Sequence, residues 1–438
     1  MSFKGVMSSW FHRISIPMRN YLQIGFFKGS QATQIEWKRQ TMNRRQNIIF
    51  WLVFWCLQIP PVFSYAGETT LQPNLSVSAR YDNNILFDRV DAIEDYSSII
   101  RPSLSLIHKT ERNTLNLDAD VKFVNYLEET DLDNTKQKYA FSIDSELTER
   151  LSSQAGVRYI LDTLLDSELE ETGITYNQED RQRINAHGGL NFSLSPKASM
   201  GAFYDFAQTD YEESTRADRN KHTVWITFSR LFNEGMDSLS VVPKYRHILV
   251  SEYVGSDPDV TIDGKEAHNF SLNLGWTHKS SEVGTIRLFL GGQYTEEIPD
   301  NGGDKRETEG VVADLSYTIK DEISNLRMGY RRDISYDADN DLREVDRLYV
   351  LFDYSLTERS QAGIYVNGYL TRTENQNSAD NDTRFLDIQT KIAYSLTERH
   401  SMELIYRFSQ EYDDAQEDKT VGRSQILLAV VLRFPTKF

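Results

Sequence analysis

The chain has 438 residues, with 48 Lys and Arg against 65 Asp and Glu, and a formal net charge of −17. This acidic balance excludes the basic surface of a typical nucleic-acid-binding protein, so we expect no nucleic-acid partner. Tyr (23) and Phe (22) are plentiful and Pro (10) is scarce, a mixture that favours pleated sheets over helical bundles. The single cysteine excludes a disulfide within the chain.

The most apolar stretch lies near the N-terminus and has the layout of a secretory signal. Two bases, Arg44 and Arg45, precede an apolar core from Ile48 to Leu57, and Pro60-Pro61 follows it. The small-residue pattern after the prolines predicts cleavage after Ala66. A transmembrane anchor is the alternative, but the apolar core is shorter than about 18 residues. We therefore predict a signal peptide over residues 42–66.

Met42 gives this signal an ordinary length, so residues 1–41 are predicted to be a misassigned start or an extended leader. Cys56 lies inside the signal and would leave with it. The exported chain would then carry neither a disulfide nor thiolate chemistry.

From Leu71 onward, segments of about 10–13 residues alternate between apolar and polar side chains. This period of two is typical of a strand with lipid on one side and water on the other. The apolar positions of three such segments are Leu117, Ala119, Val121 and Phe123; Phe270, Leu272, Leu274 and Trp276; and Met402, Leu404, Tyr406 and Phe408.

Short and long connections alternate between these segments. Short polar turns recur about every 40 residues, and the hexapeptide YSLTER appears twice among them. The longer connections are rich in acids, for instance at residues 161–180 and 296–310. The eight short turns are predicted at residues 108–112, 145–150, 194–198, 231–237, 278–282, 319–323, 354–359 and 394–399.

These patterns predict about 18 strands, the first near residues 73–81 and the last near 423–434. A soluble propeller or solenoid is the alternative, but no four-strand blade signature appears. We predict an all-β fold over residues 67–438: a transmembrane, antiparallel, up-and-down β-barrel with short periplasmic turns and longer acidic extracellular loops. The predicted location is the outer membrane of a Gram-negative bacterium, in contact with its lipid and lipopolysaccharide.

In the C-terminal segment, every second residue from Ile426 to Phe434 is apolar, and the last residue of the sequence is Phe438. Such an ending is similar to the signal that the outer-membrane assembly machinery reads. Phe434 and Phe438 are therefore the predicted assembly signal.

In each segment the polar residues occupy every second position, and these positions are predicted to face the lumen. Among the charged residues at these positions, bases outnumber acids. A channel for anionic or hydroxyl-rich solutes is one interpretation; pairing of opposite charges across neighbouring strands is the other. The predicted inward bases are Arg101, Lys122, Arg158, Arg183, Lys244, Arg246, Arg287, Arg327, Arg331, Arg347, Lys391, Arg407 and Arg433, and the acids are Asp118, Asp120, Asp144, Asp205, Asp314, Asp353, Asp387 and Glu403.

No motif for catalysis or metal binding emerges from residue spacing. His187 falls at an inward position, and His108, His278 and His400 fall in or beside turns. No His-x-x-His or carboxylate–histidine spacing indicates a metal site. We expect no enzymatic activity, no cofactor and no metal.

The chain resembles the outer-membrane β-barrel porins that are associated with exopolysaccharide secretion and PEP-CTERM/exosortase systems. The YSLTER turns, the phrases AGIYVNGYLTRTEN and MELIYRFSQEYDD, and the ending LLAVVLRF carry this resemblance. It implies an 18-stranded barrel that exports polysaccharide together with a periplasmic polysaccharide-export lipoprotein. The last four residues, from Pro435 to Phe438, depart from the simpler ending of such barrels.

Three functions remain open from the sequence: a polysaccharide-export porin, a general or substrate-selective diffusion porin for small hydrophilic solutes, and a structural or adhesive surface barrel. The third long connection is the longest, which would suit a constriction folded into the pore.

Overall fold

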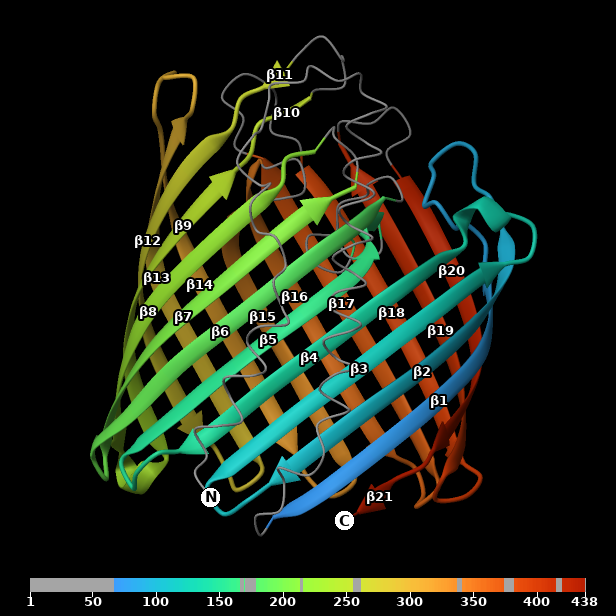
Figure 1. The fold of residues 1–438 in the computed structure, drawn as a ribbon, viewed down its shortest axis with the longest axis horizontal. Helices are drawn as coiled ribbons and strands as arrows, with labels where there is room; N and C mark the ends of the chain where they lie inside the picture. Colours follow the sequence, from blue (N-terminus) through green and yellow to red (C-terminus); the bar gives the residue numbers. More distant parts are fainter. Residues whose placement is uncertain are drawn as a thin grey trace, which may run out of the picture. The chain divides into compact units, whose positions relative to one another are not determined.

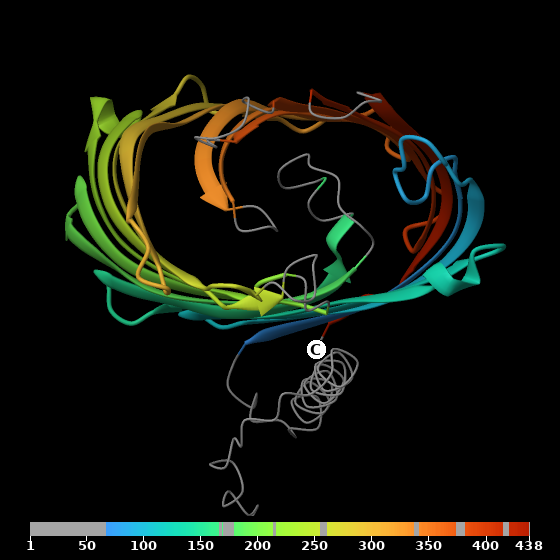
Figure 2. The same ribbon diagram turned by 90° about the horizontal axis from the view of Figure 1, so that it is seen from above.

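Eighteen long antiparallel strands close into a single β-barrel (Figures 1 and 2). The computed structural model describes residues 67–165, 169, 179–212, 216–254, 261–336, 341–373, 382–414 and 420–437. The predicted leader, the signal peptide with its cleavage site, and Phe438 lie outside the described residues. Each long strand pairs with the next along the chain, and β20 returns to pair with β1.

The long strands have these bounds: β1 Glu68–Asp82, β2 Asp95–Lys109, β3 Asn113–Tyr126, β4 Asn134–Glu146, β5 Leu151–Thr163, β6 Asp180–Ser195, β7 Ala198–Tyr211, β8 Arg219–Phe232, β9 Asp237–Val250, β12 Lys265–Lys279, β13 Gly284–Pro299, β14 Arg306–Lys320, β15 Ser324–Tyr336, β16 Leu342–Ser355, β17 Ser360–Thr373, β18 Asp382–Ser395, β19 His400–Asp413 and β20 Thr420–Arg433.

Short elements complete the described chain. β10 (Tyr253–Val254) pairs with β11 (Thr261–Ile262) in the connection between β9 and β12. Two 3-10 turns, η1 (Thr130–Leu132) and η2 (Asn233–Gly235), lie between long strands, and β21 (Thr436–Lys437) pairs with the start of β1. In the described part of the chain, no helix is long and apolar enough to cross a membrane.

The predicted fold class and strand number are confirmed, but the strands are longer than expected. They have 13–16 residues, whereas the alternation alone suggested about 10–13. The pairing continues beyond the apolar band into polar residues at both ends, where side-chain hydropathy no longer marks the strand. We call the end with the eight short connections the turn end and the opposite end the loop end. In barrels of this kind the short turns face the periplasm.

The outer face of the barrel is apolar, with aromatic residues near both rims. Leu274 and Leu290 face each other across β12 and β13 and remain 60% and 50% exposed. Tyr96 lies at the loop end of β2, and Tyr354 and Tyr394 lie near the turn end, all on this outer face. An exposed apolar band between aromatic girdles is the signature of a membrane-spanning barrel.

The repeated turn sequence has a physical reason in its threonine. In one YSLTER copy, the Thr357 hydroxyl accepts the backbone N–H groups of Arg359 (3.2 Å) and Ser360 (3.0 Å). The Thr397 hydroxyl of the second copy does the same for the two corresponding residues. Such side-chain bonds satisfy donors that the tight turn leaves without a strand partner.

An aspartate has the same role in the turn between β14 and β15. The Asp321 carboxylate accepts the backbone N–H groups of Ile323 (2.9 Å) and Ser324 (2.6 Å). The backbone and side-chain hydrogen bonds from Ser324 lower the pKa of Asp321 below its usual value.

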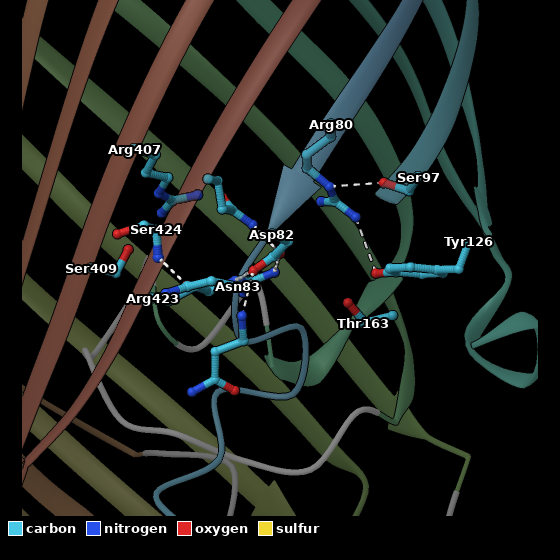
Figure 3. Close-up of polar contacts among 12 residues, drawn as sticks. Arg80, Asp82, Asn83, Ser97, Tyr126, Thr163, Arg407, Ser409, Arg423 and Ser424 are labelled. Carbon is cyan, nitrogen blue, oxygen red and sulfur yellow. Dashed lines mark hydrogen bonds and ion pairs between the residues drawn. The ribbon is translucent and has the colours of Figure 1, made fainter. Parts of the chain in front are cut away.

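The seam between β1 and β20 is closed by a buried ion pair on the inner wall (Figure 3). The Arg423 guanidinium donates to both oxygens of Asp82, at 2.6–3.0 Å, and the Gln425 amide donates to Asp82 at 2.6 Å. Next to this pair, Arg80 donates to the hydroxyl groups of Ser97 (3.0 Å) and Tyr126 (3.1 Å). The ends of the sheet are therefore joined by side chains as well as by the strand ladder.

Candidate functional site: the lumen of the barrel

Strand register fixes which side chains face the lumen. Directly opposite residues share a face, and the exposed apolar series marks the outer one. Ser76 lies opposite Arg101, for example, whereas the neighbouring pair Val77 and Ile100 faces outward. Applied around the barrel, the register places on the inner face all the sequence-predicted residues: Arg101, Lys122, Arg158, Arg183, Lys244, Arg246, Arg287, Arg327, Arg331, Arg347, Lys391, Arg407, Arg433, Asp118, Asp120, Asp144, Asp205, Asp314, Asp353, Asp387 and Glu403.

Some of these groups form ion pairs across neighbouring strands, as the structural interpretation expects. Pairs across neighbouring strands include Arg101–Asp120 (2.8 Å), Arg183–Asp162 (2.6 Å), Lys391–Glu403 (3.4 Å) and Arg407–Asp387 (2.7 Å), and Arg331 pairs with Asp333 of its own strand (2.9 Å). Arg347 instead donates to the Asn367 amide oxygen at 2.7 Å and lies over the Tyr369 ring. In this part of the wall the charges largely brace the strands.

A second group of inward bases makes no ion pair among the described residues: Arg158, Lys244, Arg246, Arg287 and Arg327. Arg158, Lys244 and Arg246 line one hollow of about 530 Å³ in the wall between β5 and β12, together with Lys221. Asp205 is the one carboxylate that lines the same hollow. The hollow is therefore a basic surface open to the lumen, suited to an anion by charge.

A stacked aromatic pair borders the basic hollow. Phe203 on β7 and Trp225 on β8 stack at 5.1 Å between ring centroids, and Trp225 lies opposite Lys244. The Phe203 ring lies flat against the wall because Gly189 and Gly201 leave room for it. A Cβ on Gly189 would lie 2.2 Å from the Phe203 ring, and one on Gly201 would lie 2.5 Å from it. These glycines keep an inward aromatic out of the channel axis.

Two leucines of the connection after β5 lie inside the lumen and contact the opposite wall. Leu165 and Leu169 are 2% and 3% exposed and belong to an apolar cluster on the inner face. The cluster also contains Phe87, from the connection after β1, and the inward residues Val345, Tyr369, Phe385 and Val421 of β16, β17, β18 and β20. Figure 2 shows the described part of this segment inside the ring of strands. The two leucines belong to the third long connection, and the constriction expected there remains a prediction for the rest of it, which lies outside the described residues.

The outer end of β15 also leaves the wall, which the sequence did not indicate. Pairing with β14 stops at Arg332, whereas β15 continues to Tyr336. The Tyr336 hydroxyl donates to Glu297 of β13 at 2.8 Å, and Arg219 of β8 donates to the Tyr336 carbonyl at 3.1 Å. Figure 2 shows this end of the strand curling inside the ring. The lumen is thus narrowed from two sides near the loop end.

The Ile334 side chain follows this bend and packs over Gly310 of β14, where a Cβ would lie 2.1 Å from its terminal carbon. It joins Tyr336 and Leu342 in a second apolar cluster, with Ile248, Val250 and Ala267 on β9 and β12. The bend could not be found from the alternation, because Ile334 and Tyr336 keep the pattern of an ordinary strand.

The remaining predicted residues have simpler positions. Phe434 lies just after β20, 45% exposed, and its backbone N–H donates to the Pro73 carbonyl at 2.9 Å. His187 faces inward opposite Asp205. His247 and His268, which residue spacing did not single out, lie opposite each other on the outer face beside Glu266.

The closed barrel, its apolar outer face and its polar lumen define an integral outer-membrane β-barrel of the porin class. Residues 60–224 match the family described as "Putative beta-barrel porin 2". Over that part, the chain is similar to a family of β-barrel porins. No curated protein matches the chain.

Several solved outer-membrane proteins are similar to this chain at a low level. The outer membrane protein opdK of Pseudomonas aeruginosa is 11% identical, with a TM-score of 0.43 over 83% of this chain and 99% of its own. OccK2 (OpdF) of the same organism is 10% identical (TM-score 0.45, 84% and 98% covered). A BenF-like porin of Pseudomonas fluorescens is also 10% identical (TM-score 0.44, 84% and 99% covered). These values are too low to transfer a substrate to this chain.

Proposed function

We propose that the protein is a passive diffusion porin for small hydrophilic solutes, with a preference for anions. The observation that carries the proposal is the basic hollow of Arg158, Lys244 and Arg246, which opens onto a lumen narrowed by two inward segments. At about 18 strands, a barrel encloses water rather than a packed core. The narrowing favours small solutes, and the uncompensated bases raise the local concentration of anions.

Permeation in this scheme needs no moving part. A solute enters at the loop end, passes between the segment with Leu165 and Leu169 and the end of β15, and then meets the basic hollow. Bases on other parts of the inner face, such as Arg287 and Arg327, continue the positive potential toward the turn end. Contacts with such scattered bases are individually weak in water, so an anion is guided without being held.

The test replaces Arg158, Lys244 and Arg246 by Gln in the purified barrel and measures reversal potentials across planar bilayers under a KCl gradient. We expect the wild-type channel to favour chloride and the triple variant to lose most of that preference. The matched control removes three exposed turn bases, Arg150, Arg359 and Arg399, and should leave ion preference near the wild-type value. Equal chloride preference in the wild type and the triple variant would refute the assigned role of the hollow.

The resemblance to exopolysaccharide-associated barrels supports a second candidate, export of polysaccharide with a periplasmic lipoprotein partner. Deletion of the gene distinguishes the two candidates. A diffusion porin predicts normal surface polymer in the deletion strain and slower uptake of small anions. Loss of surface polymer, with synthesis at the inner membrane intact, would replace the diffusion porin by the export function.

Both functions require export across the inner membrane, and we propose that residues 42–66 provide it as a cleaved signal. The mature protein would then begin at Gly67, one residue before β1 begins. N-terminal sequencing of the protein from outer membranes checks this start.

A further inference from the structure

Two histidines and a glutamate converge on the outer face of the barrel, away from the lumen. His247 of β9 lies directly opposite His268 of β12, and Glu266 precedes His268 by two residues on the same face. All three lie within four residues of the loop end of their strands, which end at Val250 and begin at Lys265. Their side chains are 25%, 25% and 39% exposed, so the group is accessible from outside the barrel.

The three side chains already point their ligand atoms at one another. His247 Nε2 lies 2.5 Å from Glu266 Oε1, and His268 Nε2 lies 3.4 Å from the same oxygen. The ligand atoms of all three residues lie within 4.8 Å of one another. Tetrahedral zinc with bonds of about 2.0–2.2 Å holds its ligand atoms roughly 3.4 Å apart. The 3.4 Å contact already has this spacing, and the 2.5 Å contact would lengthen by a small side-chain rotation of Glu266.

Neighbouring aromatic side chains fix the orientation of both imidazoles. The His247 and His268 rings stack at 5.1 Å with an interplanar angle of 8°. The Tyr245 hydroxyl lies 2.9 Å from His268 Nδ1, so that nitrogen can donate to the phenol oxygen and leave Nε2 unprotonated toward Glu266. His222 of β8 stacks on the other side of His247 at 6.2 Å. A partner on the far ring nitrogen is the usual way in which proteins orient a metal-binding histidine.

We propose that His247, Glu266 and His268 bind one divalent transition-metal ion, zinc or copper, on the outer wall of the barrel. Two imidazoles and one carboxylate suit such ions, whereas calcium and magnesium prefer oxygen ligands alone. Three protein ligands leave a coordination position for water or another oxygen ligand from the surroundings. Because the side chains project outward near the rim, that position lies outside the lumen. The ion would link β9 to β12 without taking part in permeation.

The test uses the detergent-purified barrel without a polyhistidine tag, dialysed against ZnCl2 and analysed for metal per chain. We expect one zinc per wild-type chain and less than one tenth of that occupancy, at the same free zinc, in His247→Ala and His268→Ala. Loss of the partner that orients a metal ligand typically costs about 10–100-fold in metal affinity. Tyr245→Phe should therefore bind zinc with affinity lower by about tenfold. The control is His278→Ala. It removes a histidine near the turn end of β12, the strand that also holds His268, and should keep the metal.

Folding of each variant is checked by its heat-dependent shift in gel mobility, which is independent of metal. X-ray absorption of the zinc-loaded wild type should show nitrogen and oxygen neighbours only. Absence of stoichiometric zinc from the folded wild type would overturn the proposal, and so would zinc retained by a folded His247→Ala/His268→Ala variant. Ion preference of the channel should not change with zinc, which separates this result from the proposed porin function.

Discussion

At the scale of single residues, the most informative contact is the ion pair between Asp82 and Arg423. Both side chains are almost fully buried, and Asp82 also accepts the Gln425 amide. Replacing Asp82 by Ala removes the carboxylate and leaves the buried Arg423 guanidinium without this ion pair. Breaking such a pair from one side costs about 3–5 kcal/mol of unfolding free energy. We expect Asp82→Ala to lower barrel stability by an amount of this order.

Urea unfolding in detergent, followed by tryptophan fluorescence, measures this loss. The matched control is Glu68→Ala, which removes another β1 carboxylate whose partner is Lys437. That pair is exposed to solvent, so the control should change stability little. An Asp82→Ala variant as stable as the control would show that strand pairing alone closes the seam.

The candidate site could be predicted from the sequence only as far as local alternation reaches. Strand parity is encoded locally, so residues such as Arg158 and Lys244 could be placed on the inner face without a structure. Which of them lack a carboxylate depends on neighbours around the barrel, and the sequence could not show that. The pairing of His247 with His268 likewise depends on the register of β9 against β12, which spacing along the chain does not reveal.

At the scale of elements, the segment after β5 is held across the lumen by apolar contacts. Burial of a leucine stabilises a docked segment by about 1.5–3 kcal/mol. Replacing Leu165 and Leu169 by Asp removes both contributions and places two carboxylates in an apolar cluster. We expect the segment to leave the opposite wall, and single-channel conductance to rise as the channel widens.

Conductance in planar bilayers and swelling of liposomes in sugars of increasing size measure the widening. Leu127→Asp is the matched control, because Leu127 lies in the connection after β3 and is 70% exposed. It should keep the wild-type conductance and size limit. A double variant with unchanged conductance would mean that the narrowest part of the channel lies elsewhere.

The number of strands and the type of turns could be predicted from the sequence, but the bends of individual strands could not. Threonine turns and alternating strands are local features, and they predicted 18 strands correctly. The inward bend of β15 depends on the contacts of Tyr336 with Glu297 of β13 and Arg219 of β8. Such long-range contacts leave the local pattern unchanged, so only the structure reveals them.

At the scale of the whole molecule, the outer surface must match the bilayer. Leu290 lies in the exposed apolar band, opposite Leu274. An arginine on the lipid face near the bilayer midplane costs about 2–4 kcal/mol. We expect Leu290→Arg to make the free energy of folding into lipid vesicles less favourable by that amount. Asn116→Arg, on the inner face, should fold nearly as well as the wild type, and equal losses in both variants would argue against lipid contact at Leu290.

The seam has a consequence for how the protein is made. Asp82 and Arg423 are 341 residues apart, so β1 has no partner on one side until the last strand has been synthesised. A nascent chain that lacks β20 therefore carries two open sheet edges, which are prone to pairing with other chains. Biogenesis must protect those edges during transit, and ring closure must be its final step. A truncated product would then be a target for proteolysis rather than a smaller pore.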